Sequence, residues 1–190
     1  MKPIAIITWL LAITIAKADE KVAVKTSSGR FEVTQEYRED FIETVRFLSP
    51  ELPAVQLPGF SWPGIYHISP DEHWLLRTQK TGSGDSVALL YRIEDNGRIS
   101  EILGFDDLLW KTSDVASRLK EKELYHTGIS EVRWAADSGS LAAVLRGSNA
   151  EKSEDGIEVE LVYDLKSNKA AVKNKTSEQA APSDGDKPPN

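Results

Sequence analysis

The stretch IEVELVYDL, residues 157–165, alternates apolar and polar side chains along most of its length. Apolar residues at every second position point to one face of an extended strand, and the acidic residues between them point to the other face. The same period of two appears in VALLYRI at 87–93 and, more briefly, at 141–145. The chain is therefore predicted to be mostly β, with strands that place one apolar face on a core.

A unit made of a polar turn, a strand, a loop and a second strand occurs three times. The turns are 27–30 (SSGR), 69–72 (SPDE) and 136–139 (ADSG). The strands expected after them are 31–35 with 41–48, 73–79 with 87–93, and 140–146 with 157–165, the last pair separated by a loop that extends to Gly156. Pro70 presets φ at the second turn position, and the Asp71 side chain can bond the backbone two residues on.

The segment from Tyr37 to Leu48 has two interpretations. Tyr37, Phe41, Val45 and Leu48 fit the apolar stripe of a helix, whereas Phe41, Val45 and Phe47 fit a strand. We favour the strand because this copy then matches the other two.

These repeats resemble blades of a β-propeller of the TolB-like or WD-repeat type, in which an SPDG-like turn links two strands and a later strand ends in a vYDl-like stretch. The matching residues are Ser69–Glu72 and Val162–Leu165, although Glu72 stands where Gly is typical. Because closed propellers need about four to eight blades, we expect antiparallel sheets from three propeller-blade-like repeats that stay open rather than closing a ring.

Three other segments have recognisable roles. Residues 105–122 (FDDLLWKTSDVASRLKEK) have acidic residues at the start and Lys at the end, which favours a helical insertion. This insertion is either one helix or two short helices broken near Thr112 and Ser113. Residues 49–64 carry four prolines and are predicted to form an extended connector. Asp95-Asn96-Gly97 favours a tight turn.

Residues 1–18 are typical of a cleavable signal peptide. Lys2 precedes an uncharged run over 3–16 that is too short to span a bilayer, and Ala16-Lys17-Ala18 is a small-x-small cleavage pattern. The alternative is an uncleaved N-terminal anchor. We expect one β-rich domain over 19–172 and a disordered tail over 173–190, which is poor in large apolar residues.

Composition narrows the compartment and the partners. The chain has no Cys, which excludes disulfides and thiolate metal sites, and export without Cys favours a bacterial periplasm or the extracellular space. Its formal net charge of −7 argues against nucleic acid as a partner. No second run is long and apolar enough to span a membrane.

Phe60, Trp62 and Tyr66 form the candidate binding surface, because Trp62 in a Pro-rich connector is the tryptophan we most expect to be exposed. Such a platform suits sugars or a Pro-rich peptide, and the alternative is that Trp62 plugs a sheet edge. No catalytic, metal or cofactor motif is recognisable: the run His67 to His73 lacks the spacing of a metal site, and 80–86 lacks the ending of a phosphate-binding loop.

The sequence favours an exported, non-catalytic module that binds a protein or an envelope component and takes no cofactor. A small secreted hydrolase that uses a carboxylate pair, with carbohydrate as its candidate substrate, is the alternative. A third hypothesis is an accessory piece that completes the sheet of a partner, and a dimer that pairs sheet edges is also consistent with open sheets.

Overall fold

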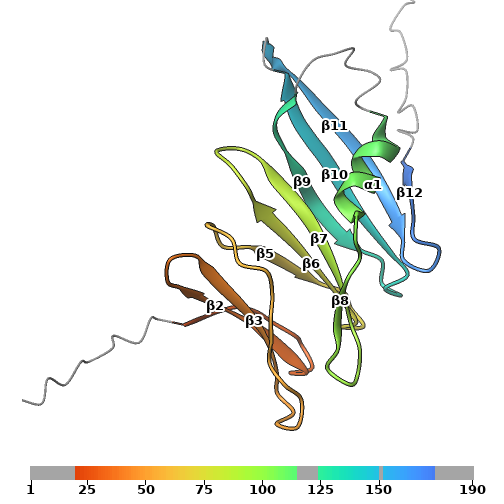
Figure 1. Cartoon of the computed structure of the whole chain (residues 1–190). Helices are drawn as coiled ribbons and strands as arrows, with labels where there is room; N and C mark the ends of the chain where they lie inside the picture. The colour runs from red at the N-terminus through yellow and green to blue at the C-terminus, as the bar shows by residue number, and fades with distance from the viewer. Residues whose placement is uncertain (1–19, 115–123, 150–151, 174–190) are drawn as a thin grey trace, which may run out of the picture.

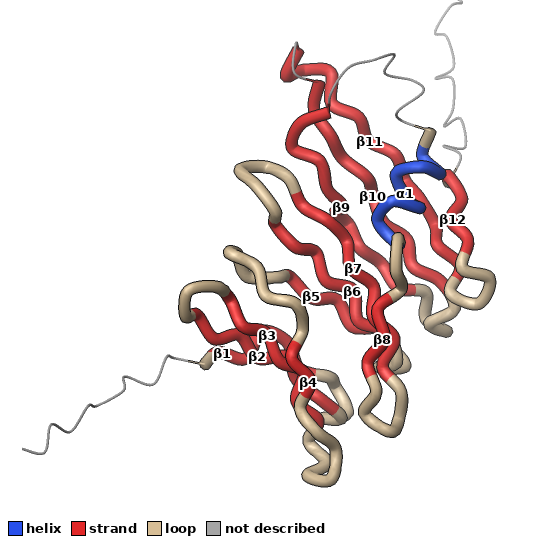
Figure 2. The backbone as a smooth tube through the Cα atoms, in the orientation of Figure 1, coloured by secondary structure: helices blue, strands red, loops and turns tan. Residues whose placement is uncertain are grey.

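The computed structural model describes residues 20–114, 124–149 and 152–173, and all structural statements below refer to these residues. The predicted leader at 1–18, all but the first residue of the predicted tail at 173–190, and the second half of the predicted helical insertion lie outside them. Within the described ranges the chain is mostly β and forms three four-stranded antiparallel sheets and one helix (Figures 1 and 2). This is the predicted fold class, and no sheet there closes into a barrel.

Each sheet is a meander in which strands that are consecutive in the chain pair with one another. Sheet 1 contains β1 (Lys21–Lys25), β2 (Phe31–Tyr37), β3 (Phe41–Phe47) and β4 (Val55–Gln56). Sheet 2 contains β5 (Ile65–Ile68), β6 (Trp74–Lys80), β7 (Ser86–Ile93) and β8 (Ile99–Glu101). Sheet 3 contains β9 (Leu124–Trp134), β10 (Ser140–Asn149), β11 (Lys152–Asp164) and β12 (Lys169–Val172).

Sheet 2 lies between the other two sheets and is apolar on both faces. Leu75, Tyr91 and Ile93 pack against the inner face of sheet 1, whereas Leu76 and Leu90 pack against sheet 3. Neighbouring residues of a strand point to opposite faces, so the run of apolar residues in β6 and β7 fills two cores at once.

The helix α1 (Phe105–Ser113) completes the core between sheets 2 and 3. Phe105 and Leu109 are buried there, and the Phe105 ring meets the Tyr163 ring edge to face, with centroids 4.9 Å apart. The helix ends at Ser113, and Asp114 after it has a left-handed φ of 54°. The predicted break near Thr112 and Ser113 therefore corresponds to the helix end. No helix among the described residues is long and apolar enough to cross a membrane.

The two outward faces of the stack are polar. On sheet 3, Arg133 contacts Glu160 at 2.6 Å and Arg146 contacts Glu158 at 3.1 Å. On sheet 1, Glu32 lies opposite Arg46 in the register of β2 and β3. Charged side chains therefore lie on the outward face of both terminal sheets.

A tight corner of the same geometry joins the first two strands of every sheet. In sheet 1 the Thr26 amide donates to the Phe31 carbonyl, and the corresponding pairs are Ser69 with Trp74 and Ala135 with Ser140, all at 2.9–3.0 Å. The fourth corner residue has a positive φ each time: Gly29 at 79°, Glu72 at 58° and Ser138 at 55°. Glu72 therefore occupies the position that favours glycine.

Each corner is hydrogen-bonded to the next one through this fourth residue. The Ser28 amide donates to the Glu72 carboxylate at 2.9 Å, and the Asp71 amide, at the same place in the second corner, donates to the Ser138 hydroxyl at 2.9 Å. The side chain at the positive-φ position thus accepts from the corner before it. Gly29 in the first corner has no side chain, and no sheet precedes it among the described residues, which begin at Glu20.

The structure corrects three details of the sequence interpretation. Each unit has four strands, because one strand precedes and one follows the two that were predicted, and the preceding strand ranges from four residues in β5 to eleven in β9. The first and third corners begin one residue earlier than expected, at Thr26 and Ala135. The long loop predicted before Gly156 is wrong: β10 and β11 extend to Asn149 and Lys152, which pair with each other. Residues 41–47 form the strand favoured over a helix.

Candidate functional site

The Pro-rich connector from Leu57 to Gly64 lies across sheets 1 and 2 and is hydrogen-bonded at close intervals. The Leu57 amide donates to the Glu43 carbonyl at 2.8 Å, and the Phe60 carbonyl accepts from the Phe41 amide at 2.9 Å. The Gln79 side chain donates to the Trp62 carbonyl at 2.9 Å. Proline provides no amide to hydrogen-bond, so the connector is held through its other backbone groups, by the backbone of β3 and by the Gln79 side chain. The connector is consequently held in one conformation.

A buried ion pair between Glu43 and Arg77 lies beneath the connector. Both side chains are fully buried, and an Arg77 Nη contacts a Glu43 carboxylate oxygen directly. Arg77 also donates to the Pro58 carbonyl at 2.8 Å, and Glu43 accepts from the Gly64 amide at 2.7 Å. Removing a charge from water is costly unless the charge is paired and hydrogen-bonded. The pair therefore fixes both ends of the connector to sheets 1 and 2.

Two of the three predicted surface residues contact this ion pair. The Phe60 ring centroid lies 4.7 Å from the Arg77 guanidinium carbon, which is cation–π geometry. The Tyr66 hydroxyl donates to Glu43 at 2.5 Å. Burial, and then the neighbouring Glu43 carboxylate, raise the pKa of Tyr66 far above its usual value, despite the opposing effect of Arg77. Tyr66 is therefore neutral and supports the connector from below.

Trp62, the third predicted residue, lies on the surface. Its side chain is 39% exposed, and Ile65 nearby is 63% exposed. The Lys80 ammonium lies 5.3 Å from the centroid of the Trp62 ring. These side chains, with Pro63, Thr78 and the loop 83–86, line a hollow of about 480 Å³, which we call the Trp62 notch.

The far wall of the Trp62 notch is held in place by contacts with sheet 3. The Asp85 carboxylate accepts hydrogen bonds from the Thr127 amide at 2.9 Å and from its hydroxyl at 3.1 Å. Gly84 packs so closely on the His126 ring that a Cβ there would lie 1.8 Å from it. The loop therefore stays close to β9, and the face of sheet 2 beside Ile65 is left uncovered.

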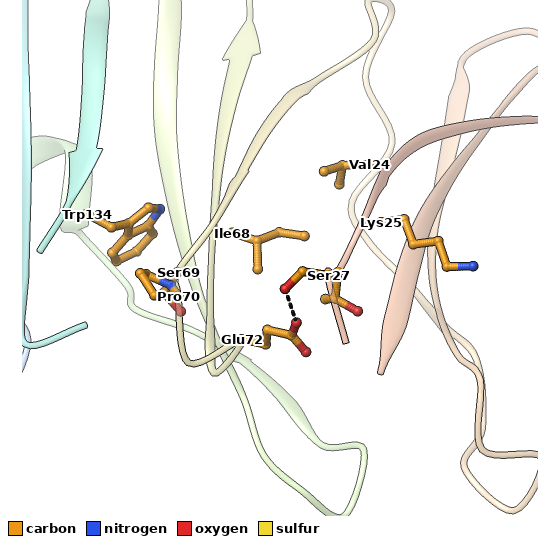
Figure 3. Close-up of a pocket in the computed structure, with 9 residues that line it drawn as sticks. Val24, Lys25, Ser27, Ile68, Ser69, Pro70, Glu72 and Trp134 are labelled. Atoms are coloured by element: carbon orange, nitrogen blue, oxygen red, sulfur yellow. Dashed lines mark hydrogen bonds between the residues drawn. The ribbon is translucent and has the colours of Figure 1, made fainter. Parts of the chain in front are cut away.

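A second hollow, of about 360 Å³, lies where the first strands of the three sheets reach their corners (Figure 3). Val24 of β1, Ile68 of β5 and Trp134 of β9 line it, together with Ser27 and Glu72, which are hydrogen-bonded at 3.1 Å. We call it the corner hollow. In Figure 3 the Lys25 ammonium points away from this space.

The carboxylate of the corner hollow is already engaged by the fold. Burial opposes the charge of Glu72, but hydrogen bonds from the hydroxyl and amide of Ser28 and from Ser27 outweigh it and lower the pKa of Glu72. Asp71 nearby also has a lowered pKa, because hydrogen bonds from Ser69 and from the His73 amide outweigh its partial burial. Both groups are ionised near neutrality and act as acceptors.

The run from His67 to His73 does not come together as a metal site. His67 lies on β5, where burial lowers its pKa, whereas His73, just before β6, is hydrogen-bonded at 3.1 Å to Asp95 in the turn between β7 and β8. Over 20–114, 124–149 and 152–173, no three His, Asp or Glu side chains are arranged to hold a metal ion.

Ile65, Lys80 and the Glu43–Arg77 pair are the parts of the site that the sequence analysis missed. An Arg within the apolar strand WLLRTQK and a Glu within FIETVRF were the available signals, because a charge on the inward face of a strand requires a buried partner. Comparisons with family models, with curated proteins and with solved structures found no match to this chain.

Proposed function

We propose that the protein is a non-catalytic binding module that recognises a protein or an envelope component through the Trp62 notch. The observation that carries this proposal is an exposed aromatic side chain on a connector that buried polar groups hold rigid. Trp62 and Ile65 expose apolar surface in spite of the cost of hydrating it, while Glu43, Arg77 and Gln79 fix the backbone around them. A rigid aromatic anchor loses little entropy on binding, so preorganisation of this kind favours recognition.

No observation on the described residues favours the alternative hydrolase. Its mechanism requires two carboxyl groups that converge on one cleft. The fully buried carboxylate, Glu43, is bonded to Arg77, Tyr66 and Gly64, and Glu72 is bonded to the preceding corner. Hydrogen-bond donors within the fold thus occupy both carboxylates.

The place of action is part of the same proposal. The predicted leader at 1–18 and the lack of Cys support export to a bacterial periplasm or to the exterior, where an envelope component is within reach. The resemblance to propeller blades supports a binding role in the same sense. N-terminal sequencing of the exported protein is expected to begin at Asp19. A chain that begins at Met1 and stays in the cytoplasm would contradict the export proposal.

Site-specific photo-crosslinking in the producing cell tests the binding proposal. A photoreactive amino acid at Trp62 or at Ile65 is expected to capture the same envelope species, identified by mass spectrometry. A control position at Arg146, on the outer face of sheet 3, is expected to capture nothing in common with them. Identical capture profiles from all three positions would contradict the proposal, as would turnover of a substrate by the purified protein without any crosslinked partner.

A further inference from the structure

The first strand of sheet 2, β5, is an edge strand with unpaired backbone groups. The Ser69 amide donates to the Trp74 carbonyl at 3.0 Å, so Ile65 and His67 direct their backbone groups toward β6 in the alternating antiparallel ladder. Tyr66 and Ile68 therefore direct theirs away from the sheet. In the part of the chain that the structure describes, neither of these two residues has a backbone hydrogen-bond partner on that side.

Other edge strands carry features that discourage pairing with another chain. Strand β1 has a Lys at each end and an irregular register between Val22 and Val24, and β9 has two register shifts along its length. Strands β4 and β8 are only two and three residues long, and β12 begins with Lys169. Bulges, lysines and short lengths all protect edges. The β5 sequence IYHI is also short, at four residues, but it has a regular register and contains no Lys and no Pro.

The two hollows lie at opposite ends of this unprotected strand. Ile65 at its start lines the Trp62 notch, and Ile68 at its end lines the corner hollow. The two residues are about 10 Å apart along an extended chain and face opposite sides of sheet 2. In paired strands, two residues that lie directly opposite each other point their side chains to the same face of the sheet. A strand laid beside β5 would thus direct one side chain into each hollow.

We propose that an extended segment of a partner polypeptide binds by adding a fifth strand to sheet 2 along β5. Its backbone pairs with the amides and carbonyls of Tyr66 and Ile68. Two of its apolar side chains, three residues apart, occupy the Trp62 notch and the corner hollow. This mode of recognition takes affinity from main-chain hydrogen bonds and specificity from pockets for side chains. The inference rests on the proposed binding function and specifies the kind of partner.

A proline substitution at Ile68 tests strand addition, and an alanine at the same position controls for the change that both substitutions make to the lining of the corner hollow. Ile68→Pro deletes the outward amide, whereas the bonds to β6 come from the neighbouring residues, so the fold is retained. Ile68→Ala removes a similar amount of side chain but keeps the amide. Ala170→Pro is the matched control, because the amide of Ala170 points away from β11 on the edge strand β12. Thermal unfolding shows whether each variant is folded.

The probe is a phage library of random peptides selected on the full mature chain. Selected peptides are expected to have two apolar residues three positions apart and to protect the amides of Tyr66 and Ile68 from hydrogen exchange. Their affinity, measured by fluorescence anisotropy, should fall about tenfold in Ile68→Pro, as expected for one lost hydrogen bond at a buried interface. Ile68→Ala should lose several times less affinity, and Ala170→Pro should match the wild type.

Four results would overturn strand addition. The first is the absence of any peptide that prefers the wild type to Ile68→Pro, and the second is an equal loss in Ile68→Pro and Ile68→Ala. The third is concentration-dependent dimerisation that Ile68→Pro abolishes, which would make a second copy of this chain the occupant. A partner crosslinked from Trp62 whose binding survives Ile68→Pro would overturn strand addition while leaving the proposed binding function intact.

Discussion

Replacing Glu72 with glycine tests the hydrogen bonds that join the corners, because two opposing effects have calculable sizes. Glu72 holds a left-handed φ of 58°, which costs a residue with a side chain about 1 kcal/mol, and Glu72→Gly removes that cost. The substitution also removes the carboxylate that accepts from Ser27 at 3.1 Å and from Ser28 at 2.9 and 2.5 Å. Together these half-buried, charge-assisted bonds contribute about 3 kcal/mol. The net expectation is a loss of about 2 kcal/mol.

Thermal unfolding followed by circular dichroism at neutral pH measures this difference. A loss of about 2 kcal/mol lowers the Tm of a domain of this size by about 4–8 °C. Ser138→Gly is the matched control: it releases the same kind of φ but loses only the bond from the Asp71 amide, so its Tm should hardly change. A Tm that rises in Glu72→Gly would contradict a stabilising role for the Glu72 carboxylate, because it would mean that the backbone conformation outweighs the hydrogen bonds at this corner.

The pH dependence of the Tm difference between the wild type and Glu72→Gly tests the role of the carboxylate separately. The pKa of Glu72 is lowered in the folded chain from an ordinary value of 4.5. Its stabilising contribution is therefore fully present above that value and is lost as pH falls through the folded pKa. The Tm difference between the wild type and Glu72→Gly should shrink from about pH 6 to about pH 3. A difference that stays constant over that interval would exclude the carboxylate as its cause.

Further predictions concern the buried ion pair and the notch above it. Arg77→Met leaves Glu43 buried without its counter-charge and should lower the free energy of unfolding in urea by about 3–5 kcal/mol. The double variant with Glu43→Leu should lose clearly less stability, and an equal or larger loss in the double variant would contradict the pairing. Gly64→Ala places a Cβ 2.7 Å from the Arg77 Nε and should cost about 1–3 kcal/mol in the same assay, so a neutral result would show that the connector does not rest on Arg77. Trp62→Ala should change the unfolding free energy by less than about 1 kcal/mol, and a loss typical of a core tryptophan would assign Trp62 to the fold rather than to a binding surface.

The main strands could be predicted because their signal is local. In β7 and β11 the apolar residues repeat at every second position over seven or more residues. The sequence Ser-Pro-Asp indicates a turn, because Pro presets φ and the Asp side chain can bond the backbone. Strands β4, β5 and β8 have two to four residues each, too few for a period, so they become strands only through pairing with a longer neighbour. The length of the β10–β11 hairpin was underestimated because Gly147 and Ser148 suggest a loop, although both pair across the ladder.

The candidate site was only partly predictable for a similar reason. Trp62 was singled out by its place among prolines, and it lies on the surface. The Glu43–Arg77 pair joins strands of two different sheets, and no periodicity within either strand shows that the two charges meet. Glu72 was interpreted as a departure from a glycine corner, whereas its side chain has a partner in the preceding sheet that the corner sequence alone does not reveal.

Binding through the Trp62 notch can be measured directly as the affinity of two full-length variants for the partner captured from Trp62, by biolayer interferometry. Trp62→Ala is expected to lose at least about tenfold in affinity, because Trp62 is the central aromatic anchor of the notch. Arg133→Ala, on the outer face of sheet 3, should bind like the wild type. Undiminished binding by Trp62→Ala, or a loss confined to Arg133→Ala, would contradict the claim that this protein acts by binding through the Trp62 notch.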